Sequence, residues 1–280
     1  MLFKRLFISL LLLLTMTSIL YAKSAEEWNK EGLDLAEQGK YEDSLSCYDK
    51  ALTINNKYGE CWYNQGNALA NLGNFHEAIK SYNKALEIDE KFSPAWNNKG
   101  GALVCLGKYE EAIVCYDKAL SLDAGQIDTW NNKGACLVIL EKYEEGIKCF
   151  DMVIELDGER VDARNNKAYA LNKLGKFQDA LEVTDKTLEF APDNADTWNT
   201  KGWALYELDK KEEGMKCFDK ALEYDPKNCY AWNNRGWIFH LQGNYEEAIK
   251  CFDKALEYDP NYEQAKINKE KTLEKMKEPE

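Results

Sequence analysis

Five asparagines of this 280-residue chain follow one another at multiples of 34 residues, and Thr200 takes the same position once. They are Asn64, Asn98, Asn132, Asn166 and Asn234. A side-chain amide offers both a donor and an acceptor, so such a row can pair with successive peptide groups of an extended chain. The alternative is that asparagine only fills a soluble helix surface. Because asparagine is a mediocre helix former, we favour the first interpretation.

Aromatic residues and a histidine share two further positions of the same period, near the C-terminal end. Tyr169, Trp203 and Trp237 share one position, and Tyr206 and His240 share the other. Aromatic side chains anchor many interfaces, so these residues form a candidate hot spot for a peptide. The same rings could stack on sugar rings or bury against neighbouring helices, and the sequence leaves these alternatives open.

Residue patterns typical of enzymes and metal centres are missing. His76 and His240 are the only histidines, and they lie in different copies of the period. No GxSxG motif, phosphate-binding glycine loop or Cys-x-x-Cys pair occurs. We therefore expect a protein that is not an enzyme and that has no catalytic residue, metal site or cofactor.

Five of the nine cysteines share one position of the period. They are Cys47, Cys115, Cys149, Cys217 and Cys251. Equivalent positions of stacked helices lie roughly 8–10 Å apart or more, whereas the Cα atoms of a disulfide lie within about 7 Å. We therefore predict that these cysteines act as small buried side chains.

The net charge argues against one class of partner. The chain has 36 basic and 49 acidic residues, for a net charge of −13. Such a surface repels phosphate backbones, so we expect no nucleic-acid partner. It also keeps a long surface soluble.

A 34-residue period positions all of these residues. Tryptophan marks one phase of it at Trp28, Trp62, Trp96, Trp130, Trp198 and Trp232. In the copy at 93–126, apolar residues recur at three- and four-residue spacing, which predicts an amphipathic helix. Gly107 ends that helix, and a second one is expected from about Glu110 to Leu122. One such hairpin cannot bury its own apolar stripe, so the copies must stack.

The copy at 229–262 has the order Trp, Gly, aromatic, Ala, aromatic, Ala, Pro. The residues are Trp232, Gly236, Tyr245, Ala248, Phe252, Ala255 and Pro260. In this order the chain resembles the tetratricopeptide repeat (TPR) family. The resemblance implies an all-α fold, a right-handed α-solenoid of tandem helix-turn-helix hairpins with a C-terminal cap helix. It also implies a non-catalytic scaffold whose concave groove is lined by the first helix of each hairpin.

The asparagine row resembles the ladder with which long TPR superhelices hold a peptide backbone, and the resemblance places both candidate sets in the groove. Another TPR device, the clamp for an acidic C-terminus, needs lysines at two positions where this chain has none.

Seven repeats and two flanking segments account for nearly the whole chain. The expected ranges are 1–22 for a signal peptide or signal anchor, 25–58, 59–92, 93–126, 127–160, 161–194, 195–228 and 229–262 for the repeats, and 263–280 for the capping helix.

The repeat at 161–194 departs most from the pattern. Arg164 replaces tryptophan, Ala168 replaces glycine, Thr184 replaces the aromatic residue and Thr187 replaces alanine. Drift in a tolerant array explains these changes, and the alternatives are a flexible joint or an arginine that faces a ligand.

The first 22 residues have the composition of an export signal. Lys4 and Arg5 precede an apolar run at 6–20, and a small residue, Ala22, follows. An uncleaved anchor, which would attach the protein to a membrane, is the alternative. Both outcomes place the repeats outside the cytoplasm, secreted or in the cell envelope. We therefore expect a scaffold that binds a protein or peptide segment there, with a carbohydrate- or envelope-polymer-binding module as the alternative.

Overall fold

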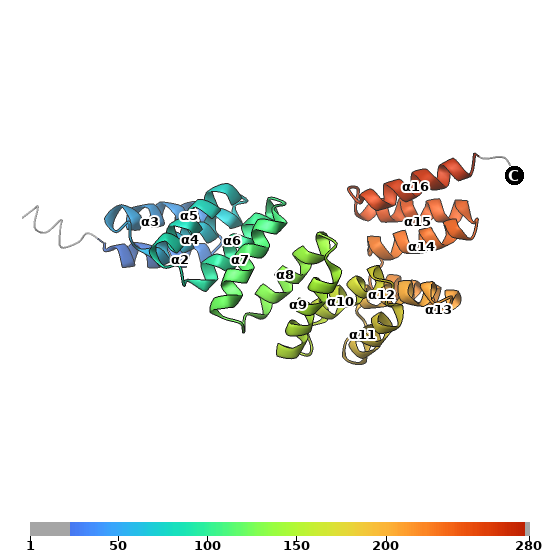
Figure 1. The fold of residues 1–280 in the computed structure, drawn as a ribbon. Coiled ribbons are helices and arrows are strands. Elements are labelled where there is room, and N and C mark those ends of the chain that lie inside the picture. Colours follow the sequence, from blue (N-terminus) through green and yellow to red (C-terminus); the bar gives the residue numbers. More distant parts are fainter. Residues whose placement is uncertain (1–22, 278–280) are drawn as a thin grey trace, which may run out of the picture. The chain divides into compact units, whose positions relative to one another are not determined.

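The structure, a computed structural model, describes residues 23–277, and the predicted signal segment at 1–22 lies outside the described residues. Every regular element of the described part is an α-helix. Its fifteen helices follow one another in pairs and fit about seven tandem repeats (Figure 1). The all-α architecture of stacked hairpins that the resemblance implies is thereby confirmed.

Two compact units, Met1–Ala124 and Gly125–Glu280, make up the chain. The helices of the first unit are α2 (Ala25–Glu37), α3 (Tyr41–Ile54), α4 (Gly59–Asn71), α5 (Phe75–Ile88), α6 (Ser93–Cys105) and α7 (Tyr109–Leu122). Those of the second unit are α8 (Ile127–Ile139), α9 (Tyr143–Leu156), α10 (Val161–Lys173), α11 (Phe177–Phe190), α12 (Ala195–Glu207), α13 (Lys211–Tyr224), α14 (Cys229–Leu241), α15 (Tyr245–Tyr258) and α16 (Glu263–Lys275). In both units the even-numbered helices are the first helices of the hairpins.

A residue with positive φ lets the chain turn from the first helix of each hairpin into the second. Glycine takes this position in five hairpins, at Gly39, Gly73, Gly107, Gly175 and Gly243. In the other two the residues are Glu141 (φ 59°) and Asp209 (φ 62°). Because a side chain at positive φ is strained, these two turns cost stability that the glycine turns do not.

Close packing of a glycine against an aromatic ring joins the two helices of a hairpin. A Cβ added at Gly100 would lie 2.5 Å from Cε1 of Tyr116, whose side chain is buried. In the divergent repeat, Ala168 and Thr184 take these two positions, and both are fully buried. The first helix thus has a larger residue, and the second helix a smaller one, than the copy at 93–126 has at the same positions. The two departures compensate each other in size.

Four of the periodic tryptophans, at Trp62, Trp96, Trp198 and Trp232, tie their helix to the preceding turn. The indole Nε1 donates to the carbonyl six residues earlier, as from Trp96 to Glu90 at 2.9 Å. Arg164, which replaces tryptophan, makes the same bond through its Nε to the carbonyl of Gly158 at 2.8 Å. Its guanidinium also lies over the ring of Phe190. Arg164 therefore has a packing role, which supports drift over a ligand-facing arginine.

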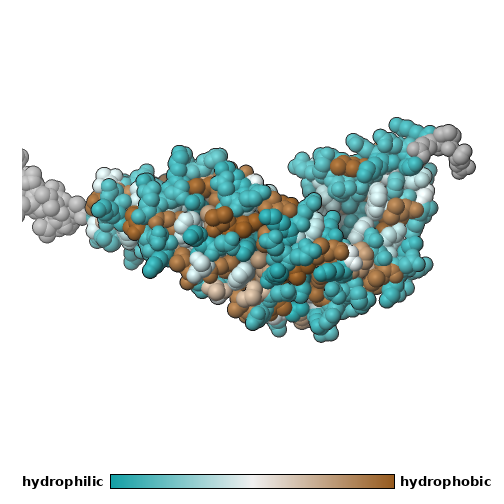
Figure 2. All heavy atoms as spheres, viewed as in Figure 1, coloured by the Kyte–Doolittle hydropathy of each residue, from teal (hydrophilic) through white to brown (hydrophobic). Residues whose placement is uncertain are grey.

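The five cysteines that share a phase are buried, as the sequence predicts. The nine cysteines all lie within the described residues and form no disulfide. None of the described helices has both the length and the apolar composition that crossing a membrane requires. Figure 2 shows a mostly hydrophilic face with small, separate hydrophobic patches.

Candidate functional site

A hollow of about 860 Å³ lies in the unit that begins at Gly125. Its lining comes from α8, α10, α12, α14 and α16, which are the first helices of that unit, and from Tyr262 just before α16. This is the side of the hairpins on which the resemblance places a groove. The volume falls in the range of about 300–1,000 Å³ that is usual for ligand sites.

Side-chain amides from several helices line this hollow. The side chain of Asn166 on α10 makes no hydrogen bond with another described residue. On α14, Asn234 donates through Nδ2 to Oδ1 of Asn199 on α12 at 2.9 Å. Since a carboxamide has two N–H groups, Asn234 keeps one for a ligand. The bond to Asn199 also holds its amide in place.

The amide row continues onto the last helix. Asn268, 34 residues after Asn234, donates to Oδ1 of Asn233 at 2.9 Å and is only 5% exposed. Asn268 is not among the residues expected from the sequence, because the charged pattern of α16 indicates a solvating cap, although the 34-residue period contains the signal. Gln264 of α16 lines the hollow as well.

Five aromatic side chains line the hollow: Tyr230, Tyr262 and three that share one position of the period on consecutive first helices, Tyr169, Trp203 and Trp237. Tyr169 is 46% exposed, and Trp203 and Trp237 are half-buried. Tyr206 packs near Trp203, with ring centroids 6.3 Å apart. His240 stacks on Trp237 at 4.8 Å with nearly parallel planes. Tyr206 and His240 are not among the lining residues, but each packs against a ring that is.

The tautomer of His240 follows from its hydrogen bonds. Oγ1 of Thr272 donates its single proton to the carbonyl of Asn268 at 2.7 Å. The contact of 2.9 Å between Nδ1 of His240 and Oγ1 of Thr272 therefore requires Nδ1 to donate. Burial lowers the pKa of His240, and the nearby Lys275 and Lys271 lower it further. Both effects favour the neutral ring, and the hydrogen bonds place its proton on Nδ1.

Asn172 is a buried polar residue of the lining that the sequence reasoning did not single out. Its Nδ2 donates to the carbonyl of Thr200 at 3.0 Å, and it is 8% exposed. Its Oδ1 is buried and has no hydrogen-bond partner among the described residues. A buried acceptor without a partner costs roughly 1–3 kcal/mol, so a donor from a ligand or a water molecule suits this position.

The remaining asparagines of the row have other surroundings. Asn64 is buried and donates to Asn29 at 3.1 Å. Nδ2 of Asn98 donates to the hydroxyl of Tyr63 at 3.0 Å and to Oδ1 of Asn67 at 2.8 Å. Both lie in the first unit and outside the hollow. The two bonds of Asn98 occupy its amide donors, and Asn64 is only 7% exposed. Asn132 on α8 is exposed and is not part of the lining.

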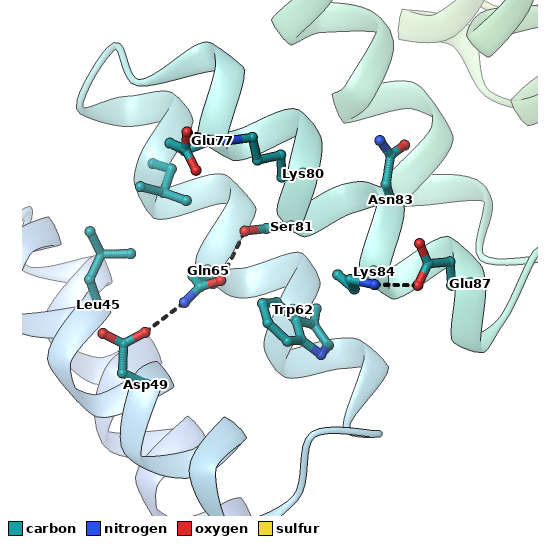
Figure 3. Close-up of a pocket in the computed structure, with 11 residues that line it drawn as sticks. Leu45, Asp49, Trp62, Gln65, Glu77, Lys80, Ser81, Asn83, Lys84 and Glu87 are labelled. Atoms are coloured by element: carbon teal, nitrogen blue, oxygen red, sulfur yellow. Dashed lines mark hydrogen bonds and ion pairs between the residues drawn. The ribbon is translucent and has the colours of Figure 1, made fainter.

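A second cavity of about 570 Å³ lies among α3, α4 and α5 of the first unit (Figure 3). Its polar groups pair with one another. Gln65 donates to Asp49 at 2.8 Å and accepts from Ser81 at 2.8 Å. Lysine–glutamate pairs at i,i+3 spacing account for its remaining charges. With few groups left for a ligand, this cavity is the weaker candidate.

Family comparisons agree with the repeat pattern. The tetratricopeptide repeat model matches residues 59–92, 93–125 and 229–262, and two further TPR models match 32–73 and 138–195. A model of the protein prenyltransferase alpha subunit repeat matches residues 212–242. No curated protein matches the chain.

Solved structures share the fold. A tetratricopeptide repeat protein from Parabacteroides merdae is 20% identical, with a TM-score of 0.74 over 89% of this chain and 98% of that one. YrrB, described as a TPR protein with an unusual peptide-binding site, is 26% identical, with a TM-score of 0.59 over 66% and 95%. MamA is 23% identical, with a TM-score of 0.55 over 58% and 95%. The chain belongs to the tetratricopeptide repeat family, whose fold is that of a generally non-catalytic scaffold suited to protein or peptide binding.

Proposed function

We propose that the unit beginning at Gly125 binds an extended segment of a protein or peptide in its hollow and performs no catalysis. The observation that carries this proposal is the pairing of two rows across the same helices. Amides at Asn166 and Asn234 accompany rings at Tyr169, Trp203 and Trp237, and all five line the hollow. The amides can form hydrogen bonds with a peptide backbone, and the aromatic rings can contact its apolar side chains.

Hydrogen-bond capacity supports a peptide ligand. Asn166 and Asn234 retain N–H groups that can donate to peptide carbonyls. The buried Oδ1 of Asn172 can accept from a peptide N–H. A peptide backbone presents both groups at every residue except proline, so one ligand can satisfy both kinds of side-chain group.

Two further observations support this class of partner. YrrB, a similar protein, is described as having a peptide-binding site. The net charge of −13 disfavours a phosphate backbone.

The apolar run at 6–20, preceded by Lys4 and Arg5, supports action outside the cytoplasm, with residues 1–22 removed or kept as a membrane attachment. Cell fractionation with N-terminal sequencing of the mature chain tests that location; a cytoplasmic chain that retains Met1 and is not in the membrane fraction would exclude it.

A peptide array probed with the mature chain tests the function, followed by titration of the best peptide against two pairs of variants. Trp237→Ala should weaken binding by about 2 kcal/mol, roughly thirtyfold, whereas Tyr224→Ala, an exposed tyrosine outside the hollow, should leave it unchanged. Asn166→Ala should weaken binding, whereas Asn132→Ala, in the same row but outside the lining, should not. Equal losses of affinity in both asparagine variants would indicate that the peptide binds along the whole asparagine row and not only in the hollow.

Carbohydrate binding is the second candidate, because Trp203 and Trp237 line the hollow and indoles can stack on sugar rings. His240 already covers one face of Trp237, which leaves at most the opposite face for a sugar. A glycan array probed with the same chain distinguishes the candidates. Glycan binding that Trp237→Ala abolishes, with no hit on the peptide array, would replace the peptide proposal.

A further inference from the structure

The row of rings in the hollow ends on a positive charge. Lys271 on α16 lies 34 residues after Trp237 and lines the same hollow. The helices α10, α12, α14 and α16 contact one another in that order. Tyr169, Trp203, Trp237 and Lys271 therefore form a series across four neighbouring helices, three rings followed by one ammonium group.

Buried polar bonds hold α16 in place on α14. Asn268 donates to Asn233 at 2.9 Å, and Thr272, which is fully buried, accepts from His240 at 2.9 Å. Lys271 lies between Asn268 and Thr272 in the sequence, so its backbone is anchored on both sides. A helix that only covered the end of the stack would need no more than an apolar face. These bonds instead fix the position of the residues that α16 contributes to the hollow.

The hollow differs in charge from the rest of the chain. It contains Lys173 and Lys271 but only one carboxylate, Asp196, which accepts from Asn228 at 2.8 Å. Neither lysine forms an ion pair with another described residue. The ammonium group of Lys173 lies over the ring of Tyr169, which leaves Lys271 as the cation without such a contact. On a chain with a net charge of −13, this hollow is suited to a negatively charged ligand group.

The spacing of the helices sets the spacing of the ligand side chains. The axes of packed helices lie about 8–10 Å apart. An extended or polyproline II chain advances about 3.1–3.3 Å per residue. About three residues of such a chain therefore span the distance from one first helix to the next.

Building on the proposed function, we propose that the hollow selects extended peptides in which apolar side chains recur at every third residue and a carboxylate, three residues beyond the last of them, pairs with Lys271. The carboxylate is either an aspartate or glutamate side chain or the C-terminus of the partner, and both offer the same oxygen acceptors. In this arrangement α16 is part of the binding site.

Fluorescence anisotropy with the mature chain and labelled synthetic peptides tests the proposal. The first two versions carry leucine or phenylalanine at every third position, followed by aspartate or asparagine at the position expected to meet Lys271. Each is made in both chain directions. A third version replaces the aspartate with a free C-terminal carboxylate, and a fourth places the apolar residues at every second position. The aspartate peptide should bind about two- to fivefold more tightly than the asparagine peptide at low salt, and the preference should shrink at 1 M NaCl. The fourth peptide should bind least well.

Two lysine variants provide the matched control. Lys271→Gln should remove the preference for aspartate over asparagine, and Lys173→Gln should retain it. Lys271→Glu should prefer a peptide with lysine at that position. Equal binding of the aspartate and asparagine peptides by the unaltered chain, or a preference that survives Lys271→Gln, would overturn the inference. If Trp237→Ala still weakened peptide binding in that case, the proposed function would stand without this inference. If no peptide of the array or of this set bound, the proposed function and the inference would both be refuted.

Discussion

Two adjacent glycines of α6 allow a matched test of how the hairpins pack. A Cβ at Gly100 would lie 2.5 Å from Cε1 and 2.9 Å from Cδ1 of Tyr116, whereas a Cβ at Gly101 would meet nothing within 4 Å. Both residues are helical, so alanine at either position gains up to about 1 kcal/mol of helix propensity. Only Gly100→Ala also crowds a buried ring.

The expected difference follows from these two effects. Overpacking a core costs about 1–3 kcal/mol, so Gly100→Ala should range from neutral to about 2 kcal/mol less stable. Gly101→Ala should be about 0.5–1 kcal/mol more stable. Urea unfolding followed by far-UV circular dichroism measures both free energies of unfolding. Hydrogen exchange of the α6 and α7 amides locates the change.

The divergent repeat suggests a compensating change. Gly100→Ala combined with Tyr116→Thr copies the buried pair of Ala168 and Thr184. Tyr116→Thr alone removes a buried ring and should cost several kcal/mol, near the roughly 3–5 kcal/mol of other large aromatic truncations. The double variant should lose less stability than the sum of the two single losses, by at least about 1 kcal/mol. Equal stabilities of Gly100→Ala and Gly101→Ala, or strictly additive losses, would refute the packing argument.

Three further predictions concern the turns, one titration and the thiols. Glu141→Gly should raise the free energy of unfolding by about 1 kcal/mol in urea unfolding, because it relieves a positive φ; a loss of stability would contradict that account. The pKa of His240 is lowered in the folded chain, so the unfolded chain binds the proton more readily and the free energy of unfolding should fall as the pH drops below about 6.5. His240→Asn keeps a donor for Thr272 and should reduce the decline between pH 7 and 5.5; an unchanged slope would exclude His240 as its source. Thiol titration should show Cys105, which is exposed, reacting first, whereas burial raises the pKa of Cys61 to about 12 and those of Cys217 and Cys251 to about 11; rapid reaction of several thiols without denaturant would contradict the buried packing.

The departures of the divergent repeat show how far single positions can be interpreted. In the sequence, Ala168 and Thr184 are two separate losses, one that crowds the helix pair and one that loosens it. In the structure both are fully buried, at the two positions where glycine and ring pack together in the copy at 93–126, so the changes in size offset each other. Arg164 likewise lacks the ring of tryptophan but reproduces its bond to the carbonyl six residues earlier. Such compensation depends on contacts between helices, which a position-by-position reading does not contain.

In the candidate site, too, some features follow from the period and others depend on contacts between repeats. The 34-residue period is enough to align Asn166, Asn234, Tyr169, Trp203 and Trp237, and these five line the hollow. Asn64 and Asn98 share the period, but Asn64 is buried and donates to Asn29, and neighbouring side chains occupy both amide donors of Asn98. Whether an amide is available to a ligand depends on partners from other repeats, and these vary from one repeat to the next.

The repeat, its two helices and the phase of each side chain follow from the order of the residues, because an α-helix converts residue spacing directly into a direction around its axis. Which of these side chains remain available to a ligand depends on how the helices pack. The tertiary structure shows that α16 contributes Asn268 and Lys271 to the hollow and that Oδ1 of Asn172 is buried without a partner. Those properties depend on distances between helices that are separated in the sequence, and packing sets such distances.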